Sequence, residues 1–243
     1  MALGIIAIIS YWWFFISTNV NPNLGNVYTN LTLGAAIFII GDYIAGRRDI
    51  KIVNKNVSWG MVIAITVVSY IVLLLSSKLA MSLSTIIPLS AILGLLATSA
   101  PVFSKSPLIN FITFGDVVAY IETFALFIAG YDLLASMFNI EIKKENLKRV
   151  KLWVIIFGLS LLFLMFHVTA KGIENNQALL LVFFMAVISM VIATIYQDAR
   201  PVVGLHILAN SIAAFPMLFQ PEMINTILTL IPKEINILLS LLL

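Results

Sequence analysis

The sequence predicts an all-α polytopic membrane protein, a bundle of about eight transmembrane helices. Hydrophobic residues make up 61% of the 243-residue chain and charged residues only 10%, with a mean hydropathy of +1.08. This leaves too little polar surface to cover a water-facing exterior. Apolar runs of about 18 residues recur along the chain, and each can cross a hydrocarbon core of roughly 30 Å as a helix. These observations exclude a soluble globular domain.

The whole chain, residues 1–243, is expected to form one transmembrane domain with short loops. The predicted spans are 3–17, 29–45, 57–76, 79–103, 108–139, 152–170, 178–196 and 202–219. The first span has no basic leader and no small-residue cleavage site, so it is expected to be retained rather than cleaved as a signal peptide. Pro88, Gly94 and Pro101 predict that the fourth span is kinked, re-entrant or incomplete. The tail at 221–243 is too short to span and is expected at the membrane interface.

Basic residues gather in two loops, and their positions bear on orientation. The first loop carries Arg47, Arg48, Lys51 and Lys55, and the second carries Lys143, Lys144, Lys148, Arg149 and Lys151. Cytoplasmic loops of membrane proteins are enriched in Lys and Arg, so both loops are expected in the cytoplasm. Eight full crossings would place them on opposite sides, whereas losing the fourth span as a crossing would place them together. The net charge of +3 fits this pattern, and no nucleic-acid partner is predicted.

Ionisable side chains within the spans are candidates for function, because burying them in lipid is costly. The chain has no cysteine, which excludes thiol chemistry and disulfides. The candidates are Asp42, Asp116, Glu122, Asp132, His167 and His206, and the two histidines are the only ones in the chain. Asp42 is expected to pair with basic residues at a helix end, Asp116 to be a first-turn acid, and Asp132 to be structural or to face a lid.

Four of the polar residues within the spans form a set suited to amide hydrolysis. Residues four apart share a helix face, so Phe163 is expected beneath His167 and Asn210 beside His206. Glu122 lies near the middle of its predicted helix. A carboxylate and a histidine meeting in a cavity can hold and deprotonate a water, and a second histidine and an amide can stabilise an oxyanion.

The spacings Phe163-x-x-x-His167 and His206-x-x-x-Asn210 resemble the second and later motifs of the CPBP family, also called the Abi family, of intramembrane endopeptidases. The family includes the CAAX-processing endopeptidase and bacteriocin-processing and self-immunity proteins. The resemblance covers roughly residues 119–219, within a family-like core at about 108–219. It implies that Glu122 with His167 activates water, while His206 and Asn210 stabilise the oxyanion, without a cofactor. The implied substrate is a membrane-embedded or lipid-anchored polypeptide. The chain itself is expected to be a multi-pass protein of the plasma membrane or its equivalent.

The chain departs from the family in its first motif, Glu-Glu-x-x-x-Arg. If Glu122 stands for the first glutamate, Thr123 and Phe127 stand for the second glutamate and the arginine. If it stands for the second, Ile121 and Leu126 occupy those places. We prefer the first register, because it keeps the glutamate that the family uses to activate water. The missing charges leave open a catalytically inactive scaffold of the same fold or a subunit of a larger membrane protein complex. A transporter is a third hypothesis, without an internal repeat in its favour.

Simpler interpretations exist for the same residues. The histidines could be structural hydrogen-bonding groups between helices, and Glu122 could be a protonated carboxyl bonded to a carbonyl. Two histidines and one glutamate match a zinc-ligand inventory, but the tight HExxH spacing is absent, so no metal is predicted. His167 and His206 lie at opposite ends of their helices. They can meet only if the helix at 152–170 continues past Ala170 and the helix at 202–219 begins before Pro201 or tilts.

Overall fold

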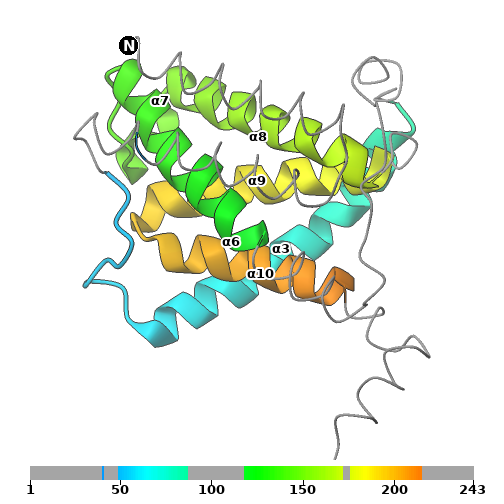
Figure 1. Cartoon of the computed structure of the whole chain (residues 1–243), viewed down its shortest axis with the longest axis horizontal. Coiled ribbons are helices and arrows are strands. Elements are labelled where there is room, and N and C mark those ends of the chain that lie inside the picture. Colours follow the sequence, from blue (N-terminus) through cyan, green and yellow to red (C-terminus); the bar gives the residue numbers. More distant parts are fainter. Residues whose placement is uncertain (1–39, 41–48, 87–117, 172–175, 215–243) are drawn as a thin grey trace, which may run out of the picture.

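The computed structural model describes residues 40, 49–86, 118–171 and 176–214 (Figure 1). Within these ranges the regular elements are α3 (Trp59–Ser84), α6 (Val118–Glu122), the π-helix η2 (Thr123–Gly130), α7 (Tyr131–Met137), the 3₁₀ helix η3 (Lys144–Lys148), α8 (Val150–Lys171), α9 (Asn176–Tyr196) and α10 (Ala199–Ala214). The described part of the chain is therefore all helical, as predicted. The spans expected at 3–17 and 29–45, most of 79–103 and the tail at 221–243 lie outside the described residues, and the full number of spans stays a prediction.

Two of the described helices, α3 and α9, are long and apolar enough to cross a membrane. They differ in their surroundings. α9 packs against α8 and α3 and is the central helix of the bundle, whereas one side of α3 exposes large apolar side chains. These exposed residues include Ile63, Val67, Val68, Ile71, Leu74 and Leu75. An exposed apolar row of this kind is typical of a lipid-facing surface.

The predicted break between the third and fourth spans is wrong. α3 runs without interruption through Ser76, Ser77 and Lys78 and ends at Ser84. Serine hydroxyls are accommodated by bonds to the preceding turn, since the hydroxyl of Ser76 donates to the carbonyl of Val72 at 2.9 Å. The later helices agree with the prediction within the described residues. α8, α9 and α10 begin two or three residues earlier than expected.

The predicted helix at 108–139 is described from Val118 onward, and its centre has a conformation that the sequence did not predict. α6, η2 and α7 form one continuous helix whose middle segment is a π-helix (Figure 1). π-Segments are rare, and they are frequent at functional sites because the wider turn re-aims the side chains around it. The π-segment begins at Thr123, directly after Glu122.

Hydrogen bonds at one end of the bundle join three parts of the chain. These are the segment before α3, α7 with the loop that follows it, and the turn between α9 and α10. Both carboxylate oxygens of Asp132 accept backbone N–H groups, from Asp49 and from Ile50, each at 3.2 Å. The carboxylate of Asp49 accepts the N–H of Ile142 at 2.6 Å, and the side chain of Gln197 donates to the carbonyl of Ile142 at 2.8 Å. Asp132 therefore has a structural role, which is one of the two that we expected.

A buried ion pair between Asp198 and Arg200 connects the same loops to the start of α10. The carboxylate of Asp198 is 0% exposed and accepts the Arg200 N–H at 2.9 Å, the Arg200 Nη2 at 2.6 Å and the Asn54 N–H at 2.9 Å. Arg200 also donates to the carbonyls of Asn54 and Val57 and lies over the ring of Trp59. Asp198 thus caps α10 and holds the segment that precedes α3 against it.

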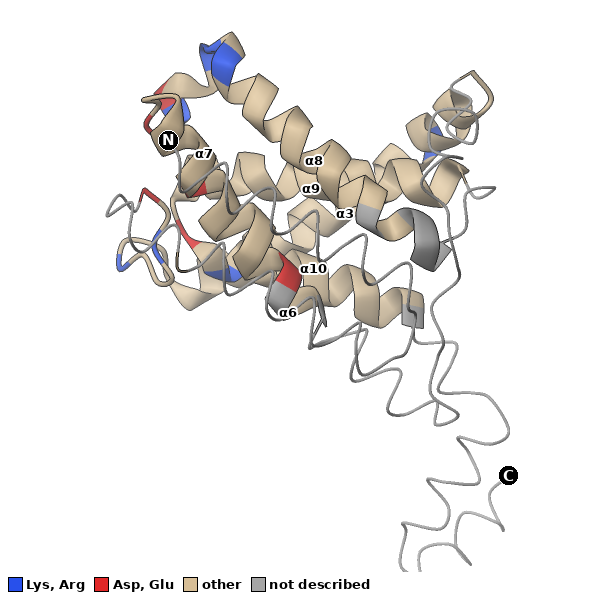
Figure 2. Ribbon diagram, turned by 45° about the horizontal axis from the view of Figure 1, so that its top comes forward, with Lys and Arg blue, Asp and Glu red and all other residues tan. Residues whose placement is uncertain are grey.

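The described parts of the two basic loops, from residue 49 and over 143–151, lie at the same end of the bundle as a result. Figure 2 shows coloured Lys and Arg gathered at that end. Lys78 belongs to the C-terminal part of α3. The bonds from Asp49 and Ile50 to Ile142 and Asp132 bring the loop carrying Lys51 and Lys55 beside the loop at 143–151. Of the two arrangements left open by the sequence, the structure has the shared one. Because cytoplasmic loops are rich in Lys and Arg, we expect this end to face the cytoplasm.

Single cysteines introduced into this cysteine-free chain test that orientation. In intact cells, a membrane-impermeant maleimide should leave Lys55→Cys and Lys148→Cys unlabelled and should label Thr85→Cys, at the other end of α3. Permeabilised cells, in which all three variants should react, provide the control. Labelling of Lys148→Cys from outside would reverse the orientation, and opposite results for Lys55→Cys and Lys148→Cys would contradict a shared end.

Candidate active site

Three ionisable side chains from three helices meet inside the bundle. Glu122 is the last residue of α6, His167 lies on α8 and His206 lies on α10. Oε2 of Glu122 is 3.6 Å from Nε2 of His206 and 3.9 Å from Nε2 of His167. Glu122 is 7% exposed and His206 is 0% exposed. The structure therefore brings together three of the four predicted site residues, and both histidines reach the same carboxylate oxygen.

The helix ends explain how His167 and His206 meet. α8 continues to Lys171, just past its predicted end, and α10 begins at Ala199, before Pro201. Pro201 is tolerated because it lies in the first turn of α10, where backbone N–H groups have no partner within the helix. His206 therefore lies about two turns inside α10 instead of at its start. Both conditions that the sequence set for a meeting of the histidines are met.

The hydrogen bond between Thr123 and His206 bears on which nitrogen of His206 carries a proton. The hydroxyl of Thr123 donates its one proton to the carbonyl of Ala119 at 2.7 Å, and its oxygen is 3.0 Å from Nδ1 of His206. With that proton already engaged, the hydroxyl can only accept from the ring, so Nδ1 is assigned as the donor. Nε2 is then the nitrogen that faces Glu122.

His167 has the same arrangement on another helix. Its Nδ1 is 2.9 Å from the carbonyl of Phe163, one turn earlier on α8. A carbonyl can only accept, so Nδ1 is again the donor and Nε2 again faces Glu122. The two rings differ in what holds them, because His206 is oriented by a side chain and His167 by its own helix backbone.

The resulting cluster is suited to holding protons and a water. In neutral rings both Nε2 atoms are acceptors, and a carboxylate facing two acceptors is stable only with a proton or a donor between them. The separations of 3.6 Å and 3.9 Å are both shorter than twice a hydrogen-bond length of about 2.8 Å, so a water between Oε2 and one Nε2 would be within bonding distance of both atoms. Such a water would donate to Oε2 and could pass a proton to either ring.

Phenylalanine rings form an apolar wall beside the cluster. The ring of Phe163, 0% exposed, lies 4.3 Å from the ring of His167 and 5.4 Å from that of His206, which it meets edge-on. Phe127 packs against Phe163 at 4.8 Å and lies 6.0 Å from His206. These contacts confirm Phe163 beneath His167. They keep both imidazole planes in place and exclude bulk water from that side.

The remaining candidates have different outcomes. Asn210 lies one turn beyond His206 on α10 and is half-buried, and its part in the site stays a prediction. Asp42 and Asp116 lie outside the described residues. Within the described ranges, no group of three or more His, Asp or Glu side chains has the arrangement of a metal site. We did not predict the contact between Thr123 and His206, and Thr123 entered only as the residue in place of the family's second glutamate.

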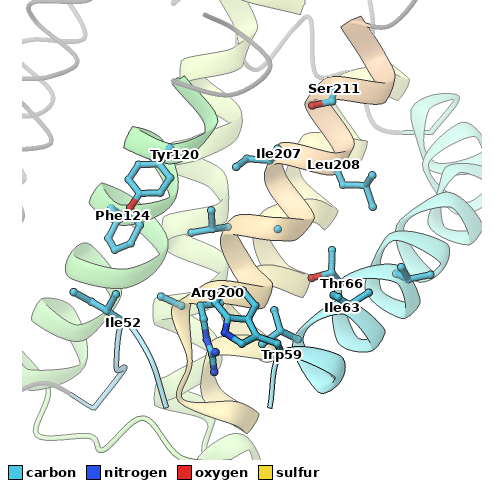
Figure 3. Close-up of a pocket in the computed structure, with 15 residues that line it drawn as sticks. Ile52, Trp59, Ile63, Thr66, Tyr120, Phe124, Arg200, Ile207, Leu208 and Ser211 are labelled. Carbon is cyan, nitrogen blue, oxygen red and sulfur yellow. The ribbon is translucent and has the colours of Figure 1, made fainter. Parts of the chain in front are cut away.

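An apolar groove of about 560 Å³ lies next to this cluster, between α3, the α6–η2 segment and α10 (Figure 3). Tyr120 and Phe124 form one wall, and Arg200 lies near one end of the groove. α3 and α10 come close together along it, since a Cβ on Gly204 would be 2.7 Å from the hydroxyl of Thr66. Glu122, His167 and His206 are not among the residues that line the groove, so the cluster lies outside it.

No family model, curated protein or solved structure matches this chain. The resemblance to the CPBP family rests on the motif residues themselves.

Proposed function

We propose that this protein is an intramembrane endopeptidase of the CPBP type, which hydrolyses a peptide bond in a membrane-embedded or lipid-anchored polypeptide. One observation carries the proposal. The only two histidines of the chain, on two different helices, both direct Nε2 at one oxygen of the buried Glu122. A structural bundle needs no such convergence, because one partner would satisfy a buried carboxyl.

The proposed reaction uses each group once. Glu122 and His167 hold a water and take its proton, and the resulting hydroxide attacks the carbonyl carbon of the substrate. His206 and Asn210 stabilise the oxyanion of the tetrahedral intermediate. The C–N bond then breaks, and the proton held by the site passes to the leaving amine.

The surroundings of the site support a multi-pass protein acting within a membrane. The exposed apolar side of α3 fits contact with lipid, and the basic end fits a cytoplasmic face. The cluster lies among buried apolar residues, where a carboxylate and imidazoles interact more strongly than in water.

The departures from the family motif have counterparts around His206. In the register that we prefer, Thr123 and Phe127 replace the second glutamate and the arginine. Thr123 bonds to His206, and Phe127 packs beside it. A hydroxyl and an aromatic ring thus occupy the places of a charged pair, which supports an intact histidine position without those charges.

A cleavage assay tests the proposal. The purified protein, in detergent and in liposomes, should cleave members of a panel of transmembrane and lipidated peptides, and His167→Ala should lower kcat/KM by about 10²- to 10⁴-fold. Ser160→Ala is the matched control, because Ser160 is a buried residue of the same helix that bonds only to the preceding turn at 2.8 Å. Failure of the wild type to cleave any peptide would contradict the enzyme and favour the scaffold or subunit.

A further inference from the structure

Thr123 and His206 form a hydrogen bond that is shielded from solvent, and its direction constrains what His206 can do. Both residues are 0% exposed. The Thr123 hydroxyl is committed as a donor to Ala119 at 2.7 Å, so it accepts from Nδ1 of His206 at 3.0 Å. A neutral His206 in this form has no proton on Nε2. It cannot donate a hydrogen bond to an oxyanion.

We propose that Thr123 is a positioning residue that keeps His206 in its Nδ1–H form, so that His206 acts as a proton relay with Glu122 and stabilises the oxyanion only as an imidazolium. The proposal rests on the proposed peptidase function. It changes the expected role of His206 from a standing neutral donor to a group that must first take a proton. The role of Glu122 with His167 in activating water is unchanged.

The proton has a short path through the cluster. Water loses a proton to Oε2 of Glu122 as its oxygen bonds to the substrate carbonyl carbon, and Glu122 passes that proton to Nε2 of His206, 3.6 Å away. The imidazolium then donates from Nε2 to the oxyanion. When the C–N bond breaks, the same proton moves to the leaving nitrogen, and Glu122 and His206 return to their starting states.

Burial makes the tautomer depend on Thr123. Without the hydroxyl, a proton on Nδ1 would lose the acceptor that it now has at 3.0 Å, whereas a proton on Nε2 would face Glu122. Phe163 and Phe127 flank the ring, so it is expected to exchange tautomers without rotating. Thr123→Val keeps the shape of the side chain and removes the acceptor. Thr123→Ser keeps the acceptor.

Nitrogen NMR of the full-length protein with labelled histidine tests the tautomer directly. The chain has two histidines, so His167→Gln assigns the remaining ring signals to His206. The wild type and Thr123→Ser should show His206 protonated at Nδ1, and Thr123→Val should move the proton to Nε2. Thr194→Val is the matched control. Thr194 is equally buried, and its hydroxyl also donates to the carbonyl one turn earlier, that of Met190, at 2.7 Å. Its second bond is to Tyr131 instead of a histidine.

Turnover gives the second measurement. Thr123→Val should lower kcat/KM by at least about 10²-fold, as expected for a histidine in the wrong tautomer, while Thr123→Ser and Thr194→Val stay near the wild type. An unchanged His206 tautomer in Thr123→Val would overturn the positioning role. A switched tautomer with unchanged turnover would overturn the relay. If the wild type cleaves no peptide, the proposed function and the relay fail together, and the NMR result still decides what Thr123 does.

Discussion

Glu122→Gln is expected to lower kcat by about 10²- to 10⁴-fold and to leave the fold intact. Gln has the shape of Glu but cannot accept a proton from water. Its NH₂ group can still donate to the Nε2 atoms of His167 and His206, which face the same side-chain oxygen in the wild type at 3.9 Å and 3.6 Å. The variant therefore keeps the packing of the site and loses its basicity. The measurement is peptide cleavage, with thermal unfolding recorded in parallel.

The same position distinguishes the enzyme from a scaffold. In a scaffold, Gln should be neutral in every assay, whereas Glu122→Leu would leave both histidines without their partner and cost about 1–3 kcal/mol. Glu145→Gln, at an exposed position in η3, is the control for the loss of one carboxylate. Equal turnover in the wild type and Glu122→Gln would contradict the enzyme with these residues in these roles.

Asp198→Ala is expected to cause the largest loss of stability, about 3–5 kcal/mol in the free energy of unfolding. Arg200 would keep its charge in a mostly buried position, where its side chain is 11% exposed, without the carboxylate that it now meets at 2.6 Å. The variant also removes the cap of α10 and the acceptor for the Asn54 N–H. Glu141→Ala is the control, since Glu141 and Lys143 form an exposed pair that should contribute at most about 1 kcal/mol.

Chemical or thermal unfolding in detergent would measure both variants. An effect of Asp198→Ala no larger than that of Glu141→Ala would show that the loops hold α10 without the buried pair.

Acid should act through the same carboxylate. Burial by itself raises the pKa of Asp198. This effect is outweighed by hydrogen bonds from the Arg200 side chain and from the backbone N–H groups of Arg200 and Asn54, and by the guanidinium charge. The pKa of Asp198 is therefore below its usual value. Because its pKa is lower in the folded state, Asp198 stabilises the protein at pH values above its unfolded-state pKa of about 3.9. This contribution is lost as the pH falls through the folded-state pKa. The unfolding temperature of the wild type should therefore fall more steeply below about pH 4 than that of Asp198→Ala. Parallel pH curves for the two proteins would contradict this.

The composition and spacing of the residues determined much of this protein. Long apolar runs predicted helices, and α8, α9 and α10 follow those runs because a helix satisfies its own backbone within one segment. The cost of burying ionisable groups selected Glu122, His167 and His206, and the structure brings these three together. The helices could be predicted because they depend on the spacing of nearby apolar residues. The site residues could be predicted because the free-energy cost of burying a charge does not depend on the fold.

Other features depend on contacts between segments far apart in the chain, and only the tertiary structure decided them. The shared end of the two basic loops follows from bonds such as Ile50 to Asp132, which no spacing in the sequence indicates. The continuation of α3 past Ser77 overrides a polar break, because serine hydroxyls bond within the helix. The π-segment after Glu122 and the bond from His206 to Thr123 likewise lie where α10 packs against η2, a contact between segments about 80 residues apart. The sequence determined which groups the site contains, and the packing of α10 against η2 determined which nitrogen of His206 faces the carboxylate, because Thr123 supplies the bond to the other nitrogen.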